Sequence, residues 1–164
     1  MDLYLLKFQM ELMRSNSLLE GTLQLLKNGA VLNVYRATSS FAGNQSEGSW
    51  NKRGGLLPPS SEVIENNGLD WRVSLAYRDS RNVSGIAGRY YPILPEVFET
   101  DNDDRSYTGV HADYRDPSNI NLTRYAGTKG CIGLQSERGW TAFQRDMDAI
   151  PKSVKVIPLL VTYT

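Results

Sequence analysis

The stretch "TLQLLKNGAVLNVYRAT", from Thr22 to Thr38, decides the fold that we expect for this chain. Asn28 and Gly29 separate two runs that are rich in Leu and Val. Both turn residues accept a positive φ, which the two-residue turns of β-hairpins require. The stretch therefore predicts a hairpin within a fold that is mainly β.

Further strands are predicted on both sides of this hairpin. The apolar segment "LYLLKFQMEL" (residues 3–12) predicts a strand in an N-terminal extension that covers residues 1–20. "VKVIPLLVTY" (residues 154–163) predicts a closing strand that is either buried or at an edge, and Pro158 favours an edge position or a bulge. "WRVSLAYR" (residues 71–78) alternates as a half-buried strand does, and its larger apolar side chains share one face: Trp71, Val73, Leu75 and Tyr77.

One amphipathic helix is predicted over residues 136–150, "SERGWTAFQRDMDAI". Ser136 is a suitable N-cap, and Pro151 stands just past the end. Four apolar side chains fall on one face at helical spacing, and we interpret them as core rather than as ligands: Trp140, Phe143, Met147 and Ile150.

Two segments carry weaker signals. Residues 39–62 are dense in Ser, Gly, Asn and Pro and predict a long loop. Between Asp79 and Asp104 glycines, prolines and aromatic residues are scattered, ending in the acidic run "ETDNDD" (residues 99–104). We interpret that run as a solvated loop rather than a metal site, because no further ligands surround it.

Composition excludes several classes of protein. The chain has 164 residues, 40% of them hydrophobic and 22% charged, which indicates a globular protein of one domain spanning residues 1–164. The net charge is zero, so the basic stripe expected of a nucleic-acid-binding protein is missing. One cysteine and one histidine cannot supply a structural zinc site. We expect no metal, no cofactor and no nucleic-acid partner.

The N-terminus, "MDLYLLKFQMELMRSN", places Asp2 where a secretory signal carries Lys or Arg. Lys7 and Glu11 interrupt its apolar run, and no stretch approaches the roughly 20 apolar residues of a membrane span. We therefore expect no signal peptide and no membrane insertion.

The single histidine and the single cysteine lie near each other, in "TGVHAD" (residues 108–113) and "GTKGCIGL" (residues 127–134). A lone cysteine is most often a buried, inert thiol, but Gly130 and Gly133 flank Cys131 here. Glycines allow a sharp bend, where backbone N–H groups converge beside a thiol as acyl transfer requires. His111 has the only side chain whose ordinary pKa suits a base that activates Cys131.

"VHAD" followed by "GTKGCIGL" resembles the signature of the L,D-transpeptidase catalytic domain, a family of bacterial cell-wall enzymes. That signature has His, a spacer, and then Ser/Thr-x-Gly-Cys with an aliphatic residue. "GTLQLLKNGAVLNVYRATSS" and "WNKRGGLLPPS" resemble the segments that precede it in the family. The resemblance implies a β-sandwich or barrel with one helix after the cysteine, and peptidoglycan stem peptides as substrates.

Carried over to this chain, the resemblance makes Cys131 the nucleophile and His111 its base. The Ala112 carbonyl orients the imidazole, and Gly130 with Cys131 supplies oxyanion N–H groups. We also expect three substrate-binding positions: Thr128, Lys129 and Asp113, the last either supporting the histidine or positioning an amine.

The chain also departs from the family. Lys129 stands where members often have a second histidine, and Gly133 stands where they commonly have arginine. The spacer between His111 and Cys131 is slightly longer than in the family. Lys129, Arg124 or Arg115 are candidates to replace the missing cation. Transpeptidation and hydrolysis both stay open.

Three readings are compatible with the sequence. The first is a cysteine acyltransferase or peptidase of the cell wall, including a phage-type or exported peptidoglycan hydrolase of the same fold. Without a signal peptide, such an enzyme would reach the wall by non-standard export, lysis or virion delivery. The second is a metallopeptidase that uses His111 and Asp113 as ligands, and the third is a non-catalytic wall-binding or tail module.

Overall fold

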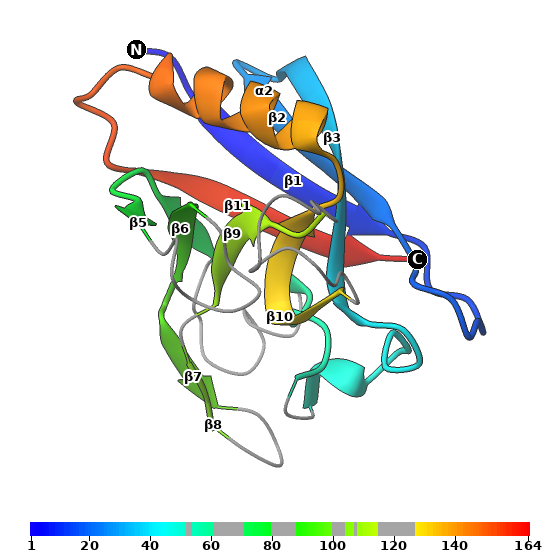
Figure 1. Cartoon of the computed structure of the whole chain (residues 1–164). Coiled ribbons are helices and arrows are strands. Elements are labelled where there is room, and N and C mark those ends of the chain that lie inside the picture. The colour runs from blue at the N-terminus through cyan, green and yellow to red at the C-terminus, as the bar shows by residue number, and fades with distance from the viewer. Residues whose placement is uncertain (52–53, 61–70, 80–87, 100–103, 107, 115–126) are drawn as a thin grey trace.

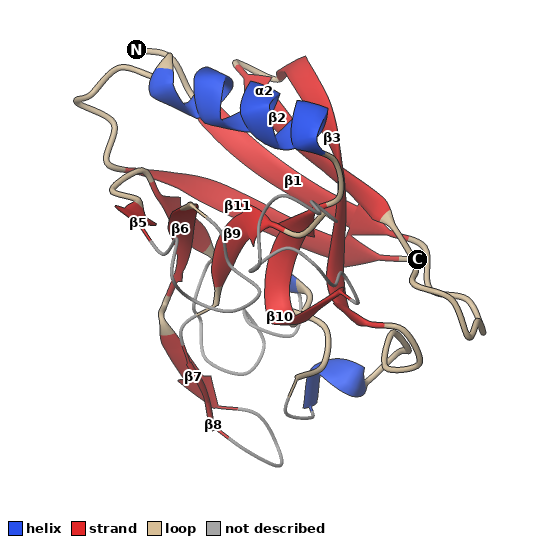
Figure 2. Ribbon diagram, in the orientation of Figure 1, coloured by secondary structure: helices blue, strands red, loops and turns tan. Residues whose placement is uncertain are grey.

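The protein is a β-barrel with one long helix packed against it (Figures 1 and 2). The computed structural model describes residues 1–51, 54–60, 71–79, 88–99, 104–106, 108–114 and 127–164. Its elements are β1 (Tyr4–Met10), β2 (Gly21–Lys27), β3 (Ala30–Phe41), a 3₁₀ turn η1 (Ser49–Asn51), β4 (Arg72–Ser74), β5 (Arg78–Asp79), β6 (Arg89–Leu94), β7 (Val97–Glu99), β8 (Asp104–Ser106), β9 (Gly109–Ala112), β10 (Gly127–Leu134), α2 (Glu137–Asp148) and β11 (Val156–Tyr163).

Eight strands close the barrel in the order β4-β11-β1-β2-β3-β10-β9-β6. The ring closes because β4 pairs with β11 on one side and with β6 on the other. For the described residues, the expectation of a mainly β fold with a helix after the cysteine segment is confirmed, and the architecture is a closed barrel. β1 pairs with both β11 and β2, so the predicted N-terminal extension supplies an integral barrel strand.

The hairpin predicted around Asn28 and Gly29 is present as β2 and β3. Both turn residues have positive φ, 52° and 81°, as the pattern required. Alternate residues of these strands point inward, among them Leu23, Leu25 and Tyr35.

The predicted helix is α2, and the side chain of Ser136 caps it by accepting a hydrogen bond from Gly139 N. Its apolar face joins the core, as expected, through Trp140, Phe143, Met147 and the following Ile150. Phe143 meets the ring of Tyr35 edge-to-face at 5.2 Å between centroids. Burying such side chains stabilises the fold by roughly 1.5–3 kcal/mol each, which fixes α2 on the barrel.

One prediction about strands is wrong in part. The segment 71–78 is not one continuous strand, because it contains β4 and the first residue of β5; Trp71 and Val73 are buried, whereas Tyr77 is 44% exposed. Of the two positions left open for the closing strand, β11 takes the interior one, between β4 and β1. Pro158 has no N–H to donate, and neither ladder of β11 needs one from it. The next residue, Leu159, donates to Trp71 O, and the ladder with β1 begins at Leu159.

The region of weak signal contains β6, a strand that the sequence analysis did not identify. β6 pairs with β9, which carries the histidine, and so becomes part of the site. The acidic run ends β7 and begins β8, and its tip, residues 100–103, lies outside the described residues. Within the described ranges, no helix has the length and apolarity needed to cross a membrane.

Candidate functional site: a cysteine and a histidine on adjacent strands

The only histidine and the only cysteine lie on neighbouring parallel strands, β9 and β10, which lie side by side in Figure 1. His111 is paired with Gly133 in this ladder. The alternate residues of both strands are fully buried in the core: Val110, Ala112, Ile132 and Leu134. Because side chains alternate along a strand, we expect His111 and Cys131 to point away from that core. The two strands that carry these residues are adjacent, as their predicted pairing requires.

A wide bulge interrupts β10 immediately before and at the cysteine. Gly127 pairs with Phe41 of β3 and Ile132 pairs with Ser39, so residues 128–131 lie opposite Ser40 alone. Gly130 has a φ of 98°, which an L side chain rarely adopts. The glycine before the cysteine therefore has the role that its position suggested: it bends the backbone at Cys131.

The hydroxyl of Thr128 fastens this bulge. Its Oγ1 accepts a hydrogen bond from Ser40 N at 3.0 Å and donates one to Cys131 O at 2.7 Å. Thr128 is buried; its bond with Ser40 is shielded from water and its bond with Cys131 O is partly shielded. We predicted Thr128 to be a substrate-binding residue; in the structure its hydroxyl binds the backbone carbonyl of Cys131 and so fixes the bulge.

Thr128→Val should loosen the bulge while keeping the shape of the side chain. Ser40 N and Cys131 O would each lose a buried partner, so we expect unfolding free energy to fall by about 1–3 kcal/mol. Urea denaturation measures this loss, and Thr128→Ser, which keeps the hydroxyl, is the matched control. Equal stability of the Val and Ser variants would contradict the fastening role.

The imidazole of His111 is held in one tautomer. Nδ1 lies 2.7 Å from Ala112 O, and because a carbonyl can only accept, Nδ1 carries the proton. Nε2 of the neutral ring is then left with a lone pair, as a base requires. Burial lowers the pKa of His111, and the hydrogen bond to Ala112 partly opposes this. The orienting role that we predicted for the Ala112 carbonyl matches this geometry.

Cys131 is a free thiol and is half-buried rather than sealed in the core. The next residue, Ile132, is fully buried. Partial exposure of Cys131 is compatible with a reactive thiol, which has to be reached by its substrate.

A tyrosine that the sequence analysis did not identify joins the cluster. Tyr90 of β6 pairs with His111, and their rings lie nearly parallel at 6.3 Å between centroids. Burial and, second, the charge of nearby Cys131 raise the pKa of Tyr90. The signal that could have found it is the run "RYYPIL", which is apolar enough for a buried strand.

Asp113 occupies the space beside Gly133. A Cβ added at Gly133 would lie 2.5 Å from Asp113 Cβ, so this position, arginine in the family, has no room for a side chain. The carboxylate of Asp113 accepts a hydrogen bond from Gln135 Nε2 at 2.6 Å and makes none with His111. Of the two roles predicted for Asp113, direct support of the histidine is therefore not seen.

Burial raises the pKa of Asp113 to about 7, and the bond from Gln135 partly opposes the rise. Because the folded state binds this proton more tightly than the unfolded state, Asp113 lowers stability as pH rises from about 4 to about 7.

Asp113→Asn keeps the size without the charge. We expect Asp113→Asn and the wild type to be equally stable near pH 4, and the variant to be more stable by about 1–2 kcal/mol at pH 8. Urea unfolding of both proteins at both pH values measures this difference in stability. A difference that does not change with pH would contradict a buried, titrating carboxyl.

Three residues predicted for the site are not among the described ones. Arg115 and Arg124 lie outside the described residues, and so does the side chain of Lys129. Among the residues that are described, no group of three His, Cys, Asp or Glu side chains is arranged to hold a metal ion.

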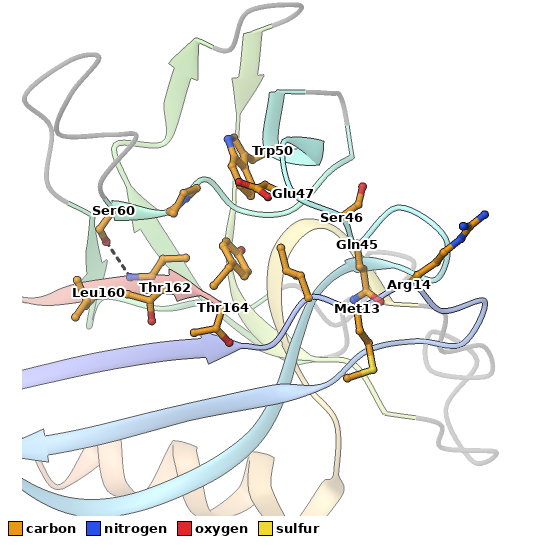
Figure 3. Close-up of a pocket in the computed structure, with 14 residues that line it drawn as sticks. Met13, Arg14, Gln45, Ser46, Glu47, Trp50, Ser60, Leu160, Thr162 and Thr164 are labelled. Carbon is orange, nitrogen blue, oxygen red and sulfur yellow. Dashed lines mark hydrogen bonds between the residues drawn. The ribbon is translucent and has the colours of Figure 1, made fainter.

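A separate cavity of about 890 Å³ opens elsewhere in the barrel (Figure 3). Residues of the β1–β2 connection, the loop after β3 and the end of β11 line it. Trp50 in its wall stacks on Tyr163, and Ser60 Oγ accepts from Val161 N at 2.8 Å. Neither His111 nor Cys131 lines this cavity.

Comparison with known proteins adds no family to this geometry. The chain matches no protein-family model, no curated protein and no solved structure. The function is therefore argued from the motif in the sequence and from the arrangement of His111, Cys131 and their neighbours.

Proposed function

We propose that the protein is a cysteine-dependent enzyme that transfers or hydrolyses acyl groups of peptidoglycan stem peptides through a thioester on Cys131. One observation carries the chemistry. A half-buried cysteine at a glycine bulge and a histidine whose Nδ1 is bound to a backbone carbonyl lie on adjacent strands. The substrate class comes from the resemblance of the two motifs to the L,D-transpeptidase signature.

In the first step His111 Nε2 takes the proton of Cys131, and the thiolate attacks the carbonyl carbon on the L side of an L-to-D peptide junction. A C–S bond forms, and negative charge develops on the carbonyl oxygen. We assign the N–H groups of Gly130 and Cys131 as its donors, because they lie at the bend. The C–N bond then breaks, and the D-residue leaves with the proton that His111 returns to its nitrogen.

In the second step His111 deprotonates an incoming nucleophile, which attacks the thioester. An amine from another stem peptide yields a crosslink, and water yields a shortened stem. Cys131 recovers its proton in both cases. Thr128, through its bonds to Ser40 and to Cys131 O, keeps the bulge in place during both steps.

The test is incubation with purified sacculi and with tetrapeptide muropeptides, followed by mass analysis. We expect loss of the terminal D-residue, with crosslinked or trimmed products, and none with Cys131→Ala. Acylation of Cys131 by a carbapenem is the second arm, since it requires the activated thiol but no stem peptide. If neither a product nor an adduct formed, the result would favour a non-catalytic wall-binding module instead.

A further inference from the structure

The phenol end of Tyr90 lies over Gly109 of β9. A Cβ added at Gly109 would lie 2.4 Å from Tyr90 Cζ and 2.5 Å from Cε2. The tip of the ring therefore lies over Gly109, in the space that any other residue's side chain would take. Gly109 permits this close approach because it has no side chain.

Gly109 is in turn the neighbour of Cys131. The ladder between β9 and β10 begins with Val110 and Ile132, and Gly109 and Cys131 are the residues just before these two. A ring that covers Gly109 thus reaches toward Cys131. The raised pKa of the phenol, to which the charge of Cys131 contributes, agrees with this placement.

We propose that Tyr90 is a positioning residue that holds the thiolate of Cys131 by donating a hydrogen bond from its hydroxyl. The proposal deepens the proposed function by adding a third group to Cys131 and His111. The phenol is well placed for this task because it is buried. It stays protonated, and so remains a donor, over the whole range in which the thiol ionises.

Hydrogen bonds to a charged acceptor are stronger than neutral ones, so the contact favours the thiolate over the thiol. Arg78 of β5 and Glu96 after β6 also act on the phenol, with opposite signs, and form an ion pair with each other.

The experiment compares Tyr90→Phe with Tyr91→Phe. Tyr90→Phe removes one oxygen and keeps the ring over Gly109, whereas Tyr91 points into the core and its hydroxyl accepts from Arg89. The rate of Cys131 alkylation by iodoacetamide is measured against pH. We expect Tyr90→Phe to raise the midpoint by about one pH unit, and so to slow alkylation about tenfold at pH values below both midpoints, with no shift in Tyr91→Phe.

An unchanged midpoint in Tyr90→Phe overturns the proposal. A second readout leaves Tyr90 intact: in Cys131→Ala, isotope-labelled tyrosine observed by NMR should show a lower pKa for Tyr90, and no change there also contradicts it. Neither measurement needs stem peptide. An inactive wild-type protein would refute the proposed function without deciding the role of Tyr90.

Discussion

Cys131→Ala abolishes processing of tetrapeptide stems while the barrel stays folded; this is the largest effect that we expect of any substitution. The chain has no other cysteine, so no second thiol can form the thioester. Cys131 is half-buried, so removing one sulfur atom costs little packing. Mass analysis of muropeptides measures the activity, and urea denaturation measures the stability.

Cys131→Ser is the matched control for this result. It keeps the shape and replaces the sulfur with a hydroxyl that is mostly not ionised, so we expect it to be inactive too. Residual processing by Cys131→Ala above the uncatalysed level would contradict a thioester mechanism. It would favour the second reading, a metallopeptidase that uses His111 and Asp113 as metal ligands.

His111→Ala lowers the rate by about 10²–10⁴, the usual contribution of a positioned base. The nucleophile would remain, but no group with a suitable lone pair would take its proton. Steady-state turnover measures the loss. Added imidazole should restore part of the rate, because it can enter the space that the side chain leaves; full activity without imidazole would contradict the pairing.

The pH profile of the wild-type enzyme follows from the same histidine. Burial lowers the pKa of His111 below its ordinary value of 6.5, so the base form predominates at neutral pH. The rate should therefore rise with pH through a midpoint below 6.5 and be level near pH 7. A midpoint above 6.5 would indicate that another group limits the rate.

Local patterns in the sequence were sufficient to predict much of the fold. The turn at Asn28 and Gly29, the helix capped by Ser136 and the strand that ends the chain were each predicted from their own residues, and all are present. These elements carry their signals within a few residues. The closure of the barrel was not predicted, because β4 joins β11 and β6 through pairings across long sequence separations.

The same distinction applies to the site. His111 and Cys131 stand out because each is the only residue of its kind, and the strands that carry them lie side by side. Tyr90 is one of nine tyrosines, and only the pairing of β6 with β9 distinguishes it. The fastening of the bulge by Thr128 depends on Ser40, which is far away in sequence, so a local pattern could not predict it.

The pH dependence of Cys131 alkylation, in the wild type and in His111→Ala, tests the central pairing most directly. With one cysteine in the chain, every modified thiol reports on this position. We predict that His111→Ala slows alkylation of Cys131 at pH 7 by about tenfold or more, because a neutral imidazole no longer takes the thiol proton as the sulfur reacts. Equal alkylation rates in the two proteins across the pH range would contradict the account.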